Sequence, residues 1–214
     1  MKNFYITLCI FLVTITQAFA STQSIQIEYN KCLKGLISNI AMANCALEYS
    51  KASELEILEI LRNNQNTTLN FKNNQALWGN YKKSTQKNIN SPLENAPGQI
   101  YYLFSAQNKY IININRLTIL DYVFNIIPCP NYNSETKNDL AEISRLLKQL
   151  KNYMTTDEYN ELKRNQADWL QYKNHTELML KAKLSTQQIL QIEDVLCSER
   201  YSQLFTLLEF LKHR

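Results

Sequence analysis

The sequence predicts an all-α protein, and three observations support this prediction. Glycine is rare: the chain of 214 residues has 3 glycines, where average usage would give roughly fifteen. The 4 prolines lie outside the long periodic segments, at positions 92, 97, 128 and 130. Apolar residues recur at helical spacing over most of the chain. A β-sandwich or a phosphate-binding loop would need many more turn glycines, so both are disfavoured.

Residues 1–20 have the pattern of a secretory signal peptide. Lys2 provides the positive start, 4–19 is apolar, and Ala18-Phe19-Ala20 is a small-x-small cleavage pattern before Ser21. The apolar part is too short and too often interrupted by polar residues for a membrane span. Cleavage near Ala20-Ser21 would remove Lys2 and lower the net charge from +4 to +3. We therefore expect an exported protein, periplasmic or secreted, without a membrane span.

Four helices are predicted in the first half, near 24–40, 44–63, 67–90 and 99–126, because apolar side chains recur every three or four positions. The segment from Ser91-Pro92 to Pro97-Gly98 separates the third from the fourth. The apolar positions that mark these helices include Ile25, Leu36 and Ile40, then Leu47, Leu55, Leu58 and Leu61, then Leu69 and Leu77, and finally Leu103, Ile111, Ile114 and Phe124.

Three more helices are predicted in the second half, after a break at 128–134. The fifth helix starts at Ser134, a plausible cap, and runs to about Tyr153. The sixth starts at Thr155, which forms a capping-box pattern with Glu158. The last helix covers 185–213. The whole chain is thus expected to form a bundle of about seven helices.

An internal repeat relates the two halves. The block 74–82 matches the block 165–173 at an offset of 91, which places the 2 tryptophans of the chain in register. The same offset aligns Leu117 with Leu208 and Leu120 with Leu211, among other positions of the last helices. We therefore predict two related three-helix units, roughly 44–126 and 129–213, with helix 24–40 as an extra leading element. The corresponding domains would be 21–127 and 128–214.

Each repeat block carries the same structural motif, consisting of a glutamine and then a tryptophan and a tyrosine on one helix face. Its residues are Gln75, Trp78 and Tyr81 in the first block, and Gln166, Trp169 and Tyr172 in the second. A ligand-stacking platform is one interpretation, but packing in the core is favoured, because such stripes usually face neighbouring helices. The glutamines are expected to hydrogen-bond across helix interfaces, and Lys82 and Lys173 to face solvent.

Cysteine usage indicates disulfides. Of the 5 cysteines, Cys9 lies in the signal peptide, and Cys32, Cys45, Cys129 and Cys197 remain. An even number in an exported chain implies two bridges, with three possible connectivities. Cys45 and Cys129 both open a repeat unit, and Cys32 in the leading helix can serve Cys45. This favours Cys32–Cys45 and Cys129–Cys197.

No catalytic, metal or cofactor site is predicted. The 2 histidines are His175 and His213, and a cysteine–histidine pair would have to use cysteines that are expected to be oxidised. There is no C-x-x-C motif. The carboxylates occur mostly on mixed-charge helical faces, and their spacing does not recommend the two-carboxylate arrangement of a glycosidase. The mild net charge and the absence of a dense basic run disfavour nucleic acid as a partner.

The motifs together resemble those of one family. Cys32 is followed by Cys45 with Glu48 close behind, and Gln75-x-x-Trp78-x-x-Tyr81-Lys82 recurs as Gln166-x-x-Trp169-x-x-Tyr172-Lys173. Near the end, Cys197 comes shortly before Arg200. This pattern is similar to that of the LprI-like lysozyme inhibitor N-terminal family of exported bacterial proteins. The family often has an arginine after the aromatic residue and a further cysteine, whereas both copies here have lysine and no such cysteine.

The resemblance implies a non-enzymatic binding protein of the cell envelope that inhibits lysozyme or a similar peptidoglycan hydrolase. An inhibitor of this kind would occlude an acidic catalytic cleft with a lysine or arginine. The first alternative is an immunity-type or effector protein that binds another bacterial or host protein. The second is an enzyme that acts on cell-wall polymers. A turbidity assay on peptidoglycan separates inhibitor from enzyme.

Overall fold

The structure is a computed structural model that describes residues 21–64, 69–96, 98–124 and 140–214. The predicted signal peptide, Cys129 and the predicted cap Ser134 lie outside the described residues. Within them the chain has seven long helices and no strand, which confirms the predicted all-α fold class. The long helices are α2 (Ser21–Leu33), α3 (Asn39–Asn63), α4 (Leu69–Thr85), α6 (Gln99–Val123), α7 (Leu140–Leu150), α8 (Thr156–Leu180) and α9 (Thr186–Lys212).

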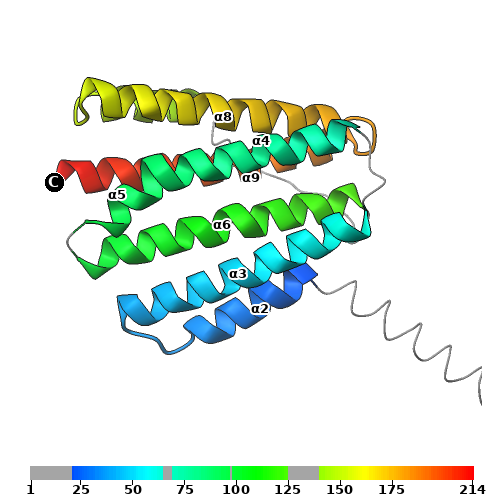
Figure 1. Cartoon of the computed structure of the whole chain (residues 1–214), viewed down its shortest axis with the longest axis horizontal. Coiled ribbons are helices and arrows are strands. Elements are labelled where there is room, and N and C mark those ends of the chain that lie inside the picture. Colours follow the sequence, from blue (N-terminus) through cyan, green and yellow to red (C-terminus); the bar gives the residue numbers. More distant parts are fainter. Residues whose placement is uncertain (1–20, 65–68, 97, 125–139) are drawn as a thin grey trace, which may run out of the picture.

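The long helices lie side by side with their axes roughly aligned, with α2 and α3 at one edge of the molecule and α8 at the opposite edge (Figure 1). Buried apolar side chains from all seven helices belong to one core cluster. Among the described residues, no helix combines the length and the apolar character that crossing a membrane requires.

The leading helix is shorter than predicted. Instead of extending to residue 40, α2 ends at Leu33, and α3 begins at Asn39. The chain reverses through Gly35, whose φ of 81° favours a residue without a side chain. A disulfide joins Cys32 in α2 to Cys45 in α3, with the two Cα atoms 6.0 Å apart. This is one of the two predicted bridges, and it fixes the leading helix to the first half.

The second predicted bridge, Cys129–Cys197, stays a prediction, because Cys129 lies outside the described residues. Cys197 lies in α9 as a free, buried thiol. Burial raises the pKa of this thiol to about 11. Because the side chain points into the core between packed helices, it behaves as a small apolar group in this structure.

The predicted break after the third helix is milder than expected. A π-helical turn, η1 (Gln86–Asn90), continues α4 into the short helix α5 (Ser91–Glu94). Pro92 lies in the first turn of α5, directly after the π-helical turn. The chain then turns at Gly98, whose φ is 112°, and enters α6.

The second half contains two capping boxes. At the start of α8, the Thr155 hydroxyl accepts from the Glu158 backbone N–H, and the Glu158 carboxylate accepts from the Thr155 N–H, as predicted. The same arrangement at Ser185 and Gln188 starts α9. Both boxes satisfy backbone donors that the first helical turn leaves unpaired.

The two halves share one packing pattern. In the first half α3 packs mainly against α6, and in the second half α7 packs mainly against α9. The two helices that carry the repeat motif, α4 and α8, pack against each other and join the halves. The described contacts therefore run through both predicted units, while the boundary between 21–127 and 128–214 falls in residues that are not described and stays a prediction.

The contact between α4 and α8 is reciprocal. The Asn74 side chain donates to the Thr176 hydroxyl at 2.9 Å, and Asn165 donates to the Thr85 hydroxyl at 3.0 Å. Asn74 and Asn165 are equivalent in the repeat, as are Thr85 and Thr176. The same pair of bonds is thus made twice, in opposite directions, as two halves related by an approximate two-fold axis require.

Candidate functional site

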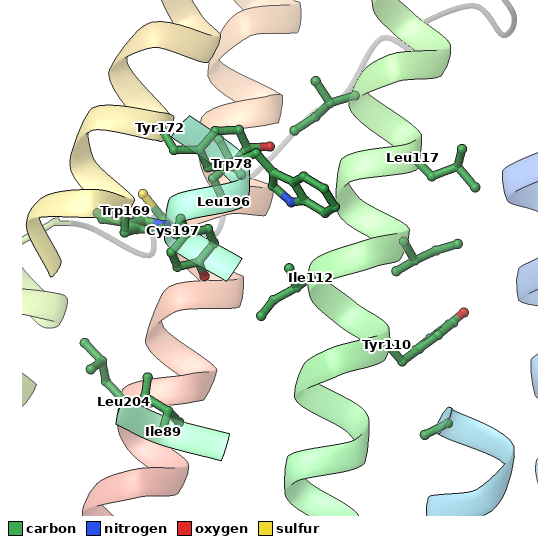
Figure 2. Packing of buried hydrophobic residues seen from close by; sticks show 14 of the residues in the cluster. Trp78, Ile89, Tyr110, Ile112, Leu117, Trp169, Tyr172, Leu196, Cys197 and Leu204 are labelled. Carbon is green, nitrogen blue, oxygen red and sulfur yellow. The ribbon is translucent and has the colours of Figure 1, made fainter. Parts of the chain in front are cut away.

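Three helices of the first half enclose a groove of about 880 Å³. Most of its lining comes from α3, α4 and α6, and η1 with the first residue of α5 completes it. Trp78 and Gly79 of α4 line it beside Ile112 and Asn113 of α6. Figure 2 shows the indole of Trp78 pointing from α4 toward α6. We call this feature the lysine groove, after the basic side chains that line it.

Positive charge dominates the lysine groove. The charged side chains that line it are Lys51, Lys82, Lys83, Lys87, Lys109 and Glu54. Five cations therefore face one carboxylate in the lining itself. Concentrated charge of one sign in a concave site attracts ligands of the opposite sign.

Two of these lysines bind carboxylates of the chain itself. Lys82 lies 2.8 Å from Glu54, and Lys109 lies 2.6 Å from Glu94. Burial raises the pKa of Glu94, but hydrogen bonds from Lys109 and Ser105 outweigh this effect, so that its pKa lies below the ordinary value. These pairs are partly exposed, and such pairs contribute little to stability.

The other lysines are more available. Lys87 pairs with Glu161 of α8 while its own side chain is 69% exposed. Lys51 and Lys83 form no ion pair within the described residues. The groove can therefore exchange weak internal contacts for contacts with an anionic ligand.

Two residues of the groove lining each have an enclosed polar atom without a hydrogen-bond partner within the described residues, as Trp169 has at Nε1 in the second half. One is the indole Nε1 of Trp78, a donor, in a residue that is 6% exposed. The other is Oδ1 of Asn113, an acceptor, in a residue that is 1% exposed. The Asn113 amide group itself donates at 3.0 Å to both the backbone oxygen and the hydroxyl of Ser50, which fixes the side chain.

Gly79 is an exposed residue of α4 in the groove lining, where it presents no side chain. A Cβ atom added there would meet no other atom within 4 Å. The repeat places Leu170 at the equivalent position of α8, where it packs against the core. The absence of a side chain at Gly79 therefore provides room that the second half does not have.

The equivalent place in the second half is neutralised and buried. Lys173, the counterpart of Lys82, is 3% exposed and pairs with Glu177 and, at 2.7 Å, with Glu193. The prediction that Lys173 faces solvent is therefore wrong. Burial lowers the pKa of Lys173, but the two carboxylates outweigh this effect and hold it above the ordinary value. Lys173 can be buried because the carboxylates of Glu177 and Glu193 compensate its charge.

The predicted structural motif lies at the centre of the molecule. Trp169 is 0% exposed, and the rings of Tyr81 and Tyr172 stack across the two halves with centroids 5.8 Å apart. Each tyrosine of the motif therefore contacts the opposite half. Both tryptophans are buried, so neither presents an exposed ring for a ligand to stack on.

The motif glutamines hydrogen-bond across helix interfaces, as predicted. Gln75 accepts from Arg116 at 2.6 Å, and Gln166 accepts from Arg200 at 2.8 Å. Both arginines are fully buried and interact with the tyrosine of the other half, Arg116 with Tyr172 and Arg200 with Tyr81. Burial lowers the pKa of both guanidinium groups.

These arginine contacts correct the alignment of the last helix of each unit. Arg116 and Arg200 play the same role and are 84 positions apart, whereas the motif blocks are 91 apart. The predicted equivalence of Leu117 with Leu208 is therefore shifted by seven residues. That shift is two helical turns, so the same face is apolar in either register and the sequence pattern does not distinguish them.

Sequence reasoning missed the buried arginines and their acidic neighbour. The Glu199 carboxylate accepts from Tyr81 at 2.6 Å and from Asn115 at 2.8 Å, and burial raises its pKa. In the corrected register Asn115-Arg116 matches Glu199-Arg200. The sequence did contain a sign of this cluster, because Arg116 and Arg200 each lie within the apolar face of a long helix.

A second, smaller pocket of about 390 Å³ lies between α6 and α9 and is lined partly by Asn115 and Glu199. Within the described residues no group of three histidine, cysteine or acidic side chains could hold a metal ion. His213 lies exposed after α9, and His175 lies in α8, outside both pocket linings.

The comparisons with known proteins support the fold. No protein-family model matches the chain, and no curated protein matches it. A crystal structure of an uncharacterized protein from Burkholderia thailandensis is similar over 88% of this chain and 96% of that one, with 16% identity and a TM-score of 0.63. At this identity the likeness extends to the fold alone. The resemblance to the LprI-like family stays a prediction.

Proposed function

We propose that this chain is an exported, non-enzymatic binding protein that uses the lysine groove to engage carboxylates of a protein partner, namely a lysozyme-like peptidoglycan hydrolase. The observation that carries the proposal is the concentration of five lysines around one concave site with a single acidic lining residue. The Cys32–Cys45 disulfide supports the proposed export, because such bridges persist mainly outside the cytoplasm.

A hydrolase of this class fits the groove through its carboxylates. Glycosidases act with paired aspartate or glutamate residues in a cleft that binds the sugar chain. Lys51 and Lys83, which have no ion pair within the described residues, are the side chains best placed to reach such carboxylates from the groove. Complementary charge at the contact would provide specificity and speed association.

Net charge narrows the choice of hydrolase. The formal charge of +4 falls to +3 when the predicted signal peptide with Lys2 is removed. Long-range repulsion would slow the protein's association with a strongly cationic lysozyme. We therefore expect acidic hydrolases of this class to be inhibited more strongly than cationic ones.

A turbidity assay on suspended peptidoglycan tests the proposal directly. The protein should slow lysis by an acidic hydrolase, and it should cause no lysis alone. The double variant Lys51→Glu with Lys83→Glu should lose the protection. A matched control reverses Lys151 and Lys181, two exposed lysines in the turns of the second half, and should keep it.

Two outcomes would contradict the proposal. Lysis by the protein alone would make it an enzyme that acts on cell-wall polymers. If the protein did not slow lysis by any of the acidic or cationic hydrolases tested, the inhibitor hypothesis would be excluded and the immunity-type alternative favoured. A pull-down with the wild-type protein and the charge-reversed variant would then identify the partner.

A further inference from the structure

We propose that cleavage of the chain before Ser21 creates an α-ammonium group that binds the carboxylates of Asp121 and Glu56, so that removal of the predicted signal peptide stabilises the fold. The predicted cleavage pattern ends at Ala20, and helix α2 begins at the next residue. The start of α2 lies at the end of the molecule where α3 and α6 end (Figure 1). The inference is independent of the lysine groove and rests on the predicted cleavage.

Asp121 is a buried acid in the last turn of α6 and contacts the first turn of α2. Its side chain is 0% exposed, and one carboxylate oxygen accepts from the hydroxyl of Thr22, which is 4% exposed. A buried carboxylate is costly unless hydrogen bonds and a cation compensate its charge. Ser21 directly precedes Thr22, so an ammonium group at its nitrogen would lie close to this carboxylate.

The register of α2 against α3 brings Glu56 to the level of Ser21. The two helices are antiparallel, and the Cys32–Cys45 disulfide fixes their register. Ser21 comes 11 positions before Cys32, and Glu56 comes 11 positions after Cys45. Because both helices rise by about 1.5 Å per residue, Ser21 and Glu56 lie at the same height along the pair.

Negative charge is concentrated around the start of α2. Burial raises the pKa of Glu56, and the charges of Glu59 and Asp121 raise it further. Glu56 and Glu59 form no ion pair within the described residues. Asp121 lies in the last turn of α6, where the helix dipole is negative as well. Cleavage would therefore create a positive charge at a place that favours one.

The cationic side chains at this end of the molecule do not compensate Glu56. Lys183, in the turn between α8 and α9, donates to the Val123 carbonyl oxygen at 2.7 Å and so caps α6. Arg62, in the last turn of α3, is exposed and forms no ion pair within the described residues. Every cause of the pKa shift of Glu56 raises that pKa, so neither cation offsets the carboxylate.

A simpler role for the three acids is to complement the positive dipole end of α2. That role is the same before and after cleavage, because the helix is present in both forms. The α-ammonium group adds a full charge at the same place, whereas an extended chain carries that charge further away. The two roles therefore give different results when the N-terminus is moved or neutralised.

Thermal unfolding near neutral pH compares the exported protein with two modified forms. One form carries a Gly-Gly extension before Ser21, and the other is acetylated at Ser21, which removes the charge. Both should unfold about 2–4 °C below the exported protein, as the loss of one ion pair predicts for a chain of this size. Glu56→Gln and Asp121→Asn should each reduce this difference, whereas Glu48→Gln, at an exposed position of α3, should leave it unchanged. Glu56→Gln alone decides if Asp121→Asn does not fold.

The pKa of the α-amino group of Ser21 is a readout that packing alone does not change, and an NMR titration measures it. It should lie above the ordinary range of about 7.7–8.0, because the carboxylates stabilise the charged form. Glu56→Gln should lower it. A raised folded-state pKa means that the added stability is fully present below the ordinary pKa and is lost as the pH rises through the folded value. The exported and acetylated forms should therefore become equally stable in strongly alkaline solution.

Three results would overturn the inference, and none of them bears on the lysine groove. One is a first residue other than Ser21 in the exported protein, found by N-terminal sequencing. Another is equal stability of the exported, extended and acetylated forms, which would leave the acids with the dipole of α2 alone. The third is a pKa of the α-amino group within the ordinary range.

Discussion

Lys82 and Lys173 occupy the same position in the two halves but have opposite surroundings. Lys82 lines an open groove and pairs with one partly exposed acid, whereas Lys173 is 3% exposed and pairs with two. The difference arises from the neighbours rather than from the lysine. The comparison shows that a repeat can preserve a scaffold while the open, lysine-lined groove forms in the first half.

The residues that are equivalent in the two halves are mainly those that form the contacts between the halves. Asn74 and Asn165 make the same bond to a threonine of the opposite half, and Arg116 and Arg200 bind the same motif glutamine. The residues that differ lie around the lysine, where Gly79 is matched by Leu170. The approximate symmetry thus serves stability, and the departures from it create the groove.

The largest expected effect comes from the two tryptophans at the centre of this scaffold. Trp78→Ala and Trp169→Ala should each cost about 3–5 kcal/mol of unfolding free energy, because each removes a large buried ring. Trp169 should lie at the upper end, since it is fully buried, while a cavity at Trp78 would join the lysine groove and could fill with water. Urea unfolding of the two variants beside wild type measures the difference.

Fluorescence adds a control to the tryptophan comparison. Both indoles are buried, so emission from each single-tryptophan protein should be blue-shifted. Red-shifted, quencher-accessible emission with unchanged stability would contradict core packing and restore the alternative of a ligand-stacking platform.

The disulfide that fastens the leading helix to the first half should have the next largest effect. The cysteines are 13 positions apart, and closing a loop of that size stabilises by about 3 kcal/mol in the chain-entropy account. The double variant Cys32→Ser with Cys45→Ser should therefore lose about that much in thermal unfolding. Equal stability of the variant and of reduced wild type would assign the loss to the bridge, and a variant as stable as the oxidised protein would contradict it.

Local sequence signals predicted the elements well where a single segment carries the information. Helical periodicity predicted the seven long helices, and Thr155 with Glu158 predicted the start of α8. The boundary at Gly35 was missed because the apolar pattern continues through Leu36 and Ile40 on either side of the turn. The period alone therefore does not mark where a helix ends.

The site was harder to predict because it depends on contacts between distant segments. Burial of Lys173 requires Glu193 from another helix, and the motif itself gives no sign of that partner. The lining of the lysine groove likewise comes mainly from three helices. One of the lining residues is Gly79, which in the sequence alone does not differ from any other helical position. The repeat alignment did contain Gly79 opposite Leu170, which is the signal that could have located the groove.

The free thiol of Cys197 gives a prediction with a sharp chemical result. In the corrected register Cys197 matches Asn113. Cys197 packs in the apolar core of the second half, whereas Asn113 lines the groove in the first half. Cys197→Ala should cost about 1 kcal/mol, the loss of a small buried group. In unreduced protein unfolded in urea, the variant should show one reactive thiol fewer than wild type.

The direction of that change decides between two states of the cysteine. If Cys197 were instead bridged to Cys129, the variant would release the partner and show one thiol more. In the folded protein Cys197 should not react at mildly alkaline pH, because burial raises its pKa to about 11.

The acid beside Arg200 makes the halves differ in their response to pH. Burial raises the pKa of Glu199 above its ordinary value, whereas the first half has the neutral Asn115 at this position. A raised folded-state pKa means that the folded protein holds the proton more tightly, so stability falls as pH rises from the unfolded pKa through the folded one. Glu199→Gln should lack this fall and be more stable than wild type at neutral pH, and equal to it in acid.

Unfolding by urea over a pH series measures the effect of Glu199→Gln. Glu142→Gln serves as the control, because Glu142 is partly exposed and pairs with Arg145 on the surface of α7. A variant that is less stable than wild type at neutral pH would mean that the ionised carboxylate stabilises the fold through Tyr81 and Asn115, and it would contradict the expected sign.

The smallest expected effect is the change in unfolding free energy when Gly79 in the groove lining is replaced. Gly79 lies within α4, and glycine inside a helix is less stable than alanine by about 0.5–1 kcal/mol. A Cβ added there meets nothing within 4 Å, so Gly79→Ala should gain that amount without strain. Leu170→Ala in the second half is the matched variant and should lose stability, because that side chain packs against the core. If Gly79→Ala were instead neutral or destabilising, the added methyl group would have to meet a neighbouring atom, which would contradict the open space around Gly79.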